Sequence, residues 1–586
     1  MIRVKNHKQQ QLFDPWGFLS PKRRRLLDES WPGLFREHLL TELPVDKLKP
    51  FLRDDFGAPS KELYTLLGAL LFQQTMDLTD AQTIEQLSFN IQWHYALNIT
   101  EESDSAKYIS EKTLWHWRQI LIAQELDQLI FDQISTKLAK VFSVKTGSQR
   151  IDSMHIKSNM RKLGRIGIFS HTIFKFLTNL KRHHRELYAI LSSRLIDRYA
   201  TPKALKAFSM IKPSESAKTL VQVSNDLYDL AEQFKDNKAV IGMHSYKLMQ
   251  RILSEQCQIK SDGGKHRVVV KKPKDVPTDS LQNPSDPDAA YSGHKGQGYQ
   301  VQIMETFTRN EDNKKKKSGL NLITHVAVEK ANAQDSDALI PAIEDSDHRG
   351  IKPDTVLADT LYGSDKNAQA AKGVDVELVA PTKDGKNGSQ VTGIRLCDFT
   401  FDDNGRVVCC PAGINPVNVR YKKKTKRFTA RFDRGQCQAC HHIDECPINP
   451  GKKHYYLWYS EKNYRLARRR QFEASDEFID LYRWRAGVEA TMSQYDRLTG
   501  VKRLRVRGLK SVRFCAVLKA TGLNILRAAM VRIAQRKARR PEKGLVVPAI
   551  MPFSFFKEQM ERYRAYVLNI MRPHFVNACS DIKTAA

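Results

Sequence analysis

Residues 355–380, TVLADTLYGSDKNAQAAKGVDVELVA, contain a strand, a helix and a second strand in close succession. The first apolar run ends at Asp359, helical spacing follows near 364–372, and a second apolar run covers 376–380. A strand, a helix and a strand with short links are typical of a parallel unit on a sheet. The segment therefore predicts two parallel strands, with Asp359 at the end of the first.

The segments before this unit predict an antiparallel part of the same sheet. Residues 299–304 and 320–328 are strand-like and are joined by a polar loop carrying Lys314–Lys317, which favours two antiparallel neighbours. Another short strand is predicted at 149–156, and helical periodicity at about 166–256 separates it from the others. The expected fold class is a mixed α+β fold, in which a mixed sheet with helices carries insertions.

Periodicity and composition divide the chain into six segments. The expected segments are a basic N-terminal arm at 1–55, a helical domain at 56–145, the first part of the mixed-sheet domain at 146–390 with a helical insertion at 160–260, a cysteine-rich β insertion at 391–465, a helical part at 466–540 and a C-terminal tail at 541–586.

The charge of the chain favours a polyanionic partner. Its 586 residues include 95 Lys and Arg against 65 Asp and Glu, a formal net charge of +30. Nucleic acid is the leading candidate, although ribosomal and membrane-surface proteins are also basic. No uninterrupted apolar stretch predicts a membrane span, and the N-terminus lacks the pattern of an export signal. We expect a cytoplasmic, nucleoid-associated protein with no membrane partner.

Three carboxylates stand among apolar neighbours, where a charge is costly unless it is paired or bound to metal. Asp152 lies in a short strand, Asp359 ends a strand, and Glu489 lies on a helix far downstream. Hydrolysis or transfer of a phosphodiester uses hard oxygen ligands that hold two Mg²⁺ ions about 4 Å apart. Taken singly, each carboxylate could equally be an ordinary salt-bridged or capping group.

The words around these carboxylates make the pattern specific. The run Asp152–Asn159, the run Ala358–Ser364 and the spacing Tyr482-x2-Arg485-x3-Glu489 resemble, in order, the three active-site motifs of DDE transposases from bacterial insertion sequences. Ser285–Ala289 followed by Gly298 and Tyr299 resembles the entry to that family's second strand, and residues 56–145 resemble its N-terminal DNA-binding domain.

The resemblance implies a ribonuclease-H-like catalytic domain. Asp152, Asp359 and Glu489 would be catalytic and would bind Mg²⁺ or Mn²⁺. The implied reaction is cleavage at transposon ends and joining of the 3′-hydroxyl to target DNA. The implied partners are double-stranded DNA, as terminal inverted repeats and target, and a second copy of the chain in a homodimer. A nuclease or resolvase without strand joining, and a domesticated DNA-binding regulator, remain alternatives.

The third motif has helical spacing, because residues 482, 485 and 489 fall at i, i+3 and i+7 on one face. Arg485 can grip a phosphate and Tyr482 can hydrogen-bond the DNA backbone. An ordinary Arg485–Glu489 surface pair is the alternative.

One position departs from many relatives, which have Lys seven residues after the Glu. This chain has Asp496 there, followed by Arg497. We expect Arg497 to supply the phosphate contact and Asp496 to turn toward Lys502 or Arg503.

Cysteines crowd into residues 409–446 with the spacing of a tetrahedral zinc site, in which a C-x2-C pair supplies two ligands. The first choice of ligands is Cys410, Cys437, Cys440 and Cys446. Cys409, His441 and His442 are substitutes, so the fourth ligand stays open, and buried free cysteines are the alternative to a zinc site.

Three cationic runs lie near the proposed catalytic residues, at 421–427, 468–470 and 502–507. A single run of this kind is more often a solvated face than a binding site. Together, on a strongly basic chain, they favour a DNA track, to which we assign Lys502, Arg503, Arg505 and Arg507.

Overall fold

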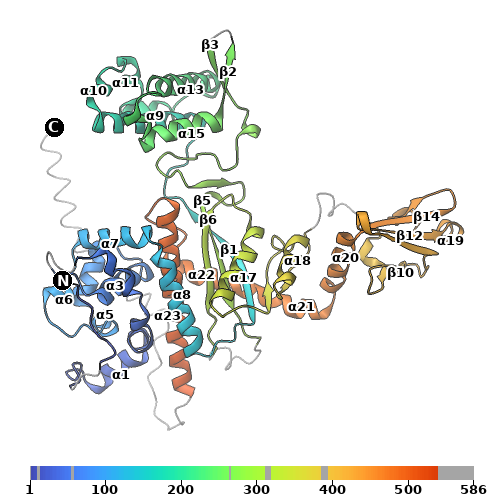
Figure 1. Ribbon diagram of the computed structural model, residues 1–586, viewed down its shortest axis with the longest axis horizontal. Coiled ribbons are helices and arrows are strands. Elements are labelled where there is room, and N and C mark those ends of the chain that lie inside the picture. The colour runs from blue at the N-terminus through green and yellow to red at the C-terminus, as the bar shows by residue number, and fades with distance from the viewer. Residues whose placement is uncertain are drawn as a thin grey trace. The chain divides into compact units, whose positions relative to one another are not determined.

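The computed structural model describes residues 2–9, 13–53, 59–262, 265–309, 319–383 and 393–538 (Figure 1). The chain divides into two units, 1–534 and 535–586. The predicted loop at Lys314–Lys317 and the predicted tail at 541–586 lie outside the described residues.

Helices make up the N-terminal part of the chain. They are α1 Pro21–Glu29, α2 Trp31–Leu34, the π-helix η1 Phe35–Leu39, α3 Leu63–Thr75, α4 Asp80–Phe89, α5 Ile91–Ala96, α6 Asp104–Lys107, α7 Glu111–Ala123 and α8 Leu126–Val141. The α3 helix starts where the Glu62 carboxylate accepts the backbone N–H groups of Tyr64 and Thr65. The expected helical region is thus present, and it begins before residue 56.

Residues 1–55 were expected to form an arm, but much of this segment is packed. Leu34, Phe35, Leu39 and Leu40 are buried in the same hydrophobic core as α3. Arg and Lys dominate the composition around residues 22–25 and hide this apolar run, which starts only after Trp31. The composition therefore indicated the basic helix α1 but not the buried helices α2 and η1 that follow it.

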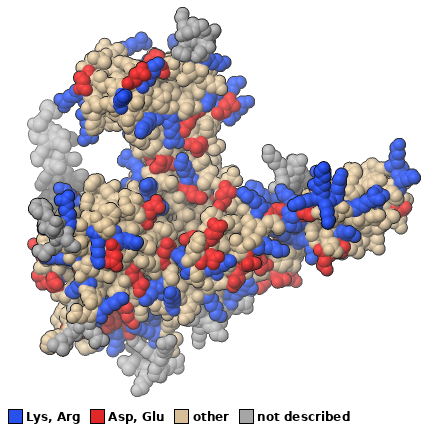
Figure 2. Space-filling view, viewed as in Figure 1, with Lys and Arg blue, Asp and Glu red and all other residues tan. Residues whose placement is uncertain are grey.

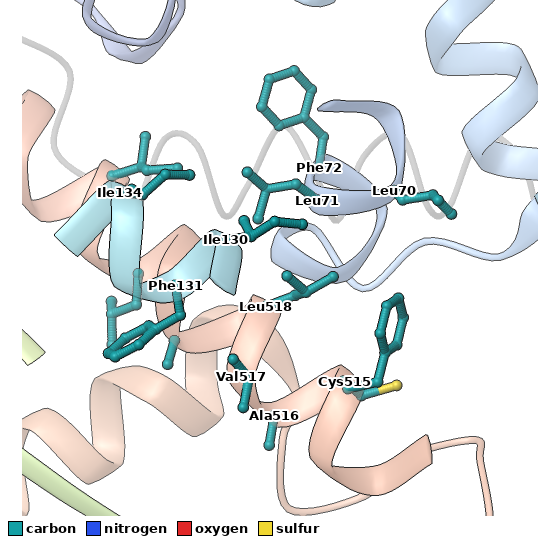
Figure 3. Packing of buried hydrophobic residues seen from close by; sticks show 14 of the residues in the cluster. Leu70, Leu71, Phe72, Ile130, Phe131, Ile134, Cys515, Ala516, Val517 and Leu518 are labelled. Carbon is teal, nitrogen blue, oxygen red and sulfur yellow. The ribbon is translucent and has the colours of Figure 1, made fainter. Parts of the chain in front are cut away.

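The N-terminal helices share their core with the last helix of the unit. Figure 3 shows Leu70, Leu71 and Phe72 of α3 and Ile130, Phe131 and Ile134 of α8 near Cys515–Leu518 of α23 (Leu509–Ala538). All of these side chains are buried, so their packing supplies hydrophobic stabilisation that joins helices far apart in the chain.

The central sheet is mixed. Its strands are β1 Ser148–Lys157, β4 Ala290–Ser292, β5 Gly296–Thr306, β6 Ile323–Lys330, β7 Thr355–Leu357 and β8 Glu377–Val379. The strand order is β4-β5-β1-β7-β8, with β6 also paired to β5. β5 is antiparallel to β1 and β6, whereas β1, β7 and β8 are mutually parallel neighbours.

Helices connect the later strands of this sheet. α17 (Leu339–His348) lies between β6 and β7, and α18 (Asp365–Gly373) lies between β7 and β8. The predicted parallel unit at 355–380 is therefore confirmed, as is the predicted antiparallel pair of β5 and β6.

The predicted helical insertion follows β1 and has its own hydrophobic core. Its elements are α9 Arg165–His183, α10 Arg185–Ala189, α11 Ser193–Tyr199, α12 Pro202–Ala207, α13 Ser216–Gln233, α14 Lys238–Ile241, α15 His244–Gln256, β2 Cys257–Asp262 and β3 Lys265–Val270.

The cysteine-rich segment folds mainly as strands around another core. Its elements are β9 Thr400–Phe401, β10 Val407–Cys409, β11 Asn418–Lys422, β12 Arg427–Asp433, α19 Arg434–Gln438, β13 Asn449–Pro450 and β14 His454–Ser460. The chain then becomes helical again, as predicted: α20 Glu461–Glu473, α21 Asp476–Tyr482, the 3-10 helix η12 Arg483–Ala486, α22 Gly487–Thr499 and α23.

Among the described helices, α23 alone is long and apolar enough to cross a membrane by length and composition. However, 83% of its most apolar window is buried inside the structure. Four of its basic residues are paired: Arg513 with Asp127, Lys519 with Asp77, Arg527 with Glu305 and Arg532 with Glu37. This burial and pairing are those of a core helix.

Candidate active site

Asp152 and Asp359 come from neighbouring parallel strands. Arg150 of β1 stands opposite Leu357, the last residue of β7. Asp152 and Asp359 each lie two residues beyond this pair, so both carboxylates lie beyond the same end of the β1–β7 ladder. The short strand and the parallel unit predicted from the sequence are what bring them together.

Arg485 joins the three sequence-predicted carboxylates. Its Nη2 lies 3.0 Å from Asp152 Oδ2 and 4.0 Å from Asp359 Oδ2, and its Nη1 lies 3.0 Å from Glu489 Oε1. Three carboxylates around one guanidinium leave an excess of negative charge. The arrangement can therefore attract a further cation.

The three carboxylates differ in environment. The Asp152 side chain is 15% exposed, whereas that of Glu489 is 66% exposed. The pKa of Asp152 is raised to about 6, mainly by burial; Asp359 and Asp335 also raise it, while Arg485 and the Ser153 backbone N–H lower it. Asp152 is thus a buried carboxylate whose charge needs a cationic partner.

A buried charge network fixes α22, which carries Glu489, against the sheet. Glu305 of β5 stands opposite Arg150 of β1, and their side chains pair at 2.7 Å between Nη2 and Oε1. Glu305 Oε2 also accepts the hydroxyl of Thr491 on α22 and lies 3.0 Å from Nη1 of Arg527 on α23. One fully buried carboxylate therefore ties two strands to two helices.

The start of α22 lies very close to β1. Arg150 Nη1 donates to the Trp484 carbonyl at 2.6 Å. A Cβ atom on Gly487 would lie 2.0 Å from this same Nη1. Glycine at 487 therefore lets the buried guanidinium reach the backbone just ahead of Glu489.

The turn after Asp359 is held by α20. Arg469 donates from Nη1 to the Gly363 carbonyl and from Nη2 to the Ala380 carbonyl, both at 2.9 Å. A Cβ atom on Gly363 would lie 1.9 Å from the Pro381 carbonyl oxygen, so this turn packs tightly on the chain after β8. The basic run at 468–470 was expected in a DNA track, but its middle residue has this structural role.

The third motif does not lie on one regular helix. Tyr482 is the last residue of α21, Arg485 lies in the 3-10 helix η12, and Glu489 is in the first turn of α22. Arg485 and Glu489 still pair at i, i+4, while the Tyr482 ring stacks on Phe478 with centroids 5.2 Å apart. The prediction of a single continuous helical face is therefore wrong, because a tighter turn replaces one α-helical turn between Tyr482 and Glu489.

The expected orientation of Asp496 is confirmed. Its Oδ1 accepts the Lys502 backbone N–H at 3.1 Å, and its Oδ2 lies 3.7 Å from Lys502 Nζ. Arg497 is exposed beside it. Asp496 is therefore engaged by the loop that follows α22.

The basic loop between α22 and α23 has apolar and charged residues with different roles. Val501 and Leu504 are buried, whereas Arg503, Arg505 and Arg507 are exposed. Arg505 Nη2 lies 2.7 Å from Asp77 Oδ2, which anchors the loop to the N-terminal helices.

The four first-choice cysteines line one small cavity. Cys410, Cys437, Cys440 and Cys446 surround a space of about 20 Å³ together with apolar side chains: Phe399, Ile414, Phe432, Ile443 and Ile448. The Ile414 backbone N–H donates to Cys410 Sγ at 3.4 Å. Cys409 and the neighbouring rings of His441 and His442 do not line this cavity.

The thiols also affect one another. The pKa of Cys437 is raised to about 11, mainly by burial and in addition by the neighbouring thiols of Cys446, Cys410 and Cys440. Burial also raises the pKa of Cys446, although a backbone hydrogen bond from Ile448 opposes this. The thiolate forms therefore destabilise one another, and a divalent cation would reverse this effect by binding them.

Neither cluster is a finished coordination shell. Within the described ranges, no group of three or more His, Cys, Asp or Glu side chains is arranged to hold a metal ion as it stands. At the carboxylates, the Arg485 guanidinium occupies the space between the oxygens. The donor atoms fit the expected metals by chemistry, hard oxygens for Mg²⁺ or Mn²⁺ and sulfur for Zn²⁺.

Several positioning residues escaped sequence reasoning. Arg150 and Glu305 lie within apolar strands, where a charged residue is expected to be paired. This placement was the only feature of the sequence that indicated a role for them. Lys295 and Asp335 form a similar pair next to β1: Lys295 Nζ lies 2.9 Å from Ser153 Oγ and 3.0 Å from Asp335 Oδ2.

Two family models match parts of the chain. Residues 409–529 match a transposase DDE domain, and residues 30–120 match a transposase domain (DUF772). Glu489 lies inside the first match, whereas Asp152 and Asp359 lie outside both. No curated protein matches the chain.

The two matches support a transposase with a distinct N-terminal domain and a DDE catalytic domain. A DDE domain implies transposition, DNA binding and an enzyme that cleaves and joins DNA. Such enzymes typically use a divalent metal.

Proposed function

We propose that this chain is the transposase of a bacterial insertion sequence, with Asp152, Asp359 and Glu489 as its catalytic carboxylates. It binds the terminal inverted repeats, cleaves phosphodiesters there and joins the 3′-hydroxyl ends to target DNA. The observation that carries the proposal is the meeting of three carboxylates from distant segments around Arg485. An antiparallel trio of strands followed by two parallel strands supports a ribonuclease-H-like catalytic domain.

The three carboxylates would hold Mg²⁺ or Mn²⁺. When bound, the ions supply Lewis-acid stabilisation of charge on the nucleophilic and leaving oxygens. The protein's part is to hold the carboxylates in place. Asp152 and Asp359 are fixed by parallel neighbouring strands, and Glu489 is fixed by the network around Glu305.

Arg485 and Tyr482 would bind the DNA backbone beside the carboxylates. Arg485 Nε is buried and has no hydrogen-bond partner among the described residues, and a planar guanidinium can donate to a phosphate oxygen. Tyr482 is half-buried, and burial raises the pKa of its hydroxyl; Arg485 lowers this pKa, and Asp359 and Asp152 raise it, so the hydroxyl lies close enough to interact with the charges of the site. Together the two residues can orient a scissile phosphodiester.

The surface after Glu489 would extend this contact. Arg497, Arg503, Arg505 and Arg507 are exposed, and Lys502 is partly exposed beside Asp496. These cations would follow the phosphates of a duplex, adding affinity that falls as salt rises. Since two ends must be processed, a homodimer would bring one carboxylate site to each end.

The cysteine cavity would bind a structural Zn²⁺ through Cys410, Cys437, Cys440 and Cys446. The convergence of the four thiols on one small space of about 20 Å³ supports this assignment, as do the backbone N–H groups directed at Cys410 and Cys446. Four sulfur ligands leave no open position for a substrate, which is typical of a structural zinc site.

Strand joining tests the proposed function. The purified chain is incubated with Mg²⁺ or Mn²⁺, duplexes taken from the DNA on each side of its gene, and a supercoiled target plasmid. A transposase yields plasmid molecules covalently joined to 3′ ends of the duplexes. A nuclease or resolvase would cut without joining, and a DNA-binding regulator would bind without cutting.

A further inference from the structure

Net charge alone does not locate a DNA surface on this chain. On the face shown in Figure 2, Lys and Arg side chains are spread over every part of the molecule. In the helical insertion, by contrast, the two halves differ in charge. Residues 165–212, which contain α9–α12, include ten Lys and Arg but only two Asp and Glu. Residues 213–256 include five Lys and Arg and six Asp and Glu. Positive charge is therefore concentrated in the first half of the insertion.

That half also contains an open hollow of about 480 Å³. It is lined by Thr178, Lys181 and Arg182 of α9 and by Arg185 and Tyr188 of α10. The three basic side chains are exposed, and no carboxylate among the described residues forms an ion pair with any of them. Cations thus meet in a concave site without acidic groups to neutralise them.

Helix electrostatics explain only part of this arrangement. Basic residues are favoured at a helix C-terminus, and Lys181 and Arg182 occupy the last turn of α9. Arg185 and Tyr188 belong to the next helix, beyond the break at His184, yet they line the same hollow. Lys181 Nζ lies 5.5 Å from the centre of the Tyr188 ring, which joins the two helices at this point. Residues from two elements therefore face one space.

The hollow has the chemistry of a phosphate-binding surface. Lys, Arg, Thr and Tyr side chains are all common donors to phosphate oxygens in DNA complexes. The five lining residues include no carboxylate and no aliphatic side chain. A chain of phosphodiesters can satisfy several such donors at once.

We propose that this hollow binds the phosphate backbone of double-stranded DNA, so that the helical insertion is a DNA-binding module. This inference rests on DNA being the partner of the chain, as in the proposed function. The insertion has its own hydrophobic core, and the hollow shares no residue with the carboxylate cluster. Its contacts carry no sequence information of their own and hold the duplex to the protein.

The test is the salt dependence of DNA binding by the full chain. The triple variant Lys181→Gln, Arg182→Gln, Arg185→Gln is compared with wild type for a short random-sequence duplex across a series of salt concentrations. A matched control, Lys218→Gln, Lys238→Gln, Lys247→Gln, removes the same charge from exposed positions in the second half of the insertion. Circular dichroism and thermal unfolding establish that each variant is folded.

The proposal predicts that the first triple variant lowers the slope of log affinity against log salt by about two to three units, because each phosphate contact contributes about 0.9. The control variant keeps the wild-type slope. Equal slopes for the first variant and wild type overturn the proposal. An equal decrease of the slope in the first variant and in the control variant overturns it as well. The slope is also measured with an RNA duplex. If the first variant lowers the slope for RNA but not for DNA, the proposal is overturned. Strand joining is scored separately, so a chain that fails to join DNA but shows this slope change refutes the proposed function alone.

Discussion

Arg485 Nη2 lies 3.0 Å from Asp152 Oδ2, although 333 residues separate the two along the chain. The same guanidinium contacts Glu489, four residues later. A purely structural ion-pair network is the simplest alternative explanation of such a cluster. Three carboxylates against one guanidinium, with Asp152 largely buried, would make a poor structural network because most of the negative charge stays unpaired. The imbalance fits a site that receives further cations.

The Glu305 network should be essential for stability. Glu305→Ala leaves the buried guanidinium of Arg150 without its partner and removes the contact to Arg527. Loss of one member of a buried pair typically costs about 3–5 kcal/mol. Chemical denaturation would measure this loss. The control Glu344→Ala, at an exposed position of α17, should change the free energy of unfolding little, and equal losses in the two variants would contradict the assignment.

Arg469 should affect the reaction rate through the turn that follows Asp359. Arg469→Lys keeps the charge but cannot bridge the carbonyls of Gly363 and Ala380 as a planar guanidinium does. We expect cleavage to slow by about 10- to 100-fold, as for loss of groups that support a ligand shell, with DNA affinity unchanged. The neighbouring variant Arg468→Lys is the control. A wild-type rate for Arg469→Lys would show that this clamp does not position Asp359.

The fold around the parallel unit could be predicted from the sequence, because short links and apolar periodicity determine the pairing of β7 and β8. The meeting of Asp152 and Asp359 was implied only by the resemblance of the motifs around them. The network around Glu305 could not be predicted in this way. Its partners lie 155 and 222 residues away, and they meet only through strand register and helix packing that no local pattern specifies.

The third motif shows another limit of sequence patterns. Residues 482–489 have helical spacing, yet the structure has a 3-10 helix at Arg483–Ala486. The two helix types differ by a fraction of a residue per turn, so the same residues fit either one. The contact between Arg150 and the Trp484 carbonyl, which comes from a distant strand, stabilises the tighter turn.

The cysteine cavity should contain metal. Protein purified under reducing conditions should carry about one zinc per chain, and chelation should unfold mainly the strands β9–β14. Cys437→Ser should lose the zinc, whereas Cys397→Ser, a cysteine outside the cavity, should retain it. Metal analysis of the reduced wild-type protein that finds no zinc would exclude the site.

Arg497 should contribute one phosphate contact. Arg497→Ala should lower the salt slope of DNA binding by about one unit without changing zinc content. Lys366→Ala, at an exposed position of α18, provides the matched loss of charge. The Lys366 variant should keep the wild-type slope. A wild-type slope for the Arg497 variant as well would contradict the prediction and leave Arg485 as the phosphate contact of the third motif.

The central claim is that Asp152, Asp359 and Glu489 form one catalytic centre, and single-turnover cleavage tests it most directly. The variants Asp152→Asn, Asp359→Asn and Glu489→Gln are compared with wild type and with the control Asp347→Asn, on duplexes from either side of the gene with Mg²⁺. Neutral amides bind Mg²⁺ poorly, so each of the three should abolish cleavage while folding and most DNA affinity remain. The control should cleave like wild type. A near wild-type cleavage rate in any one of the three variants would contradict the claim.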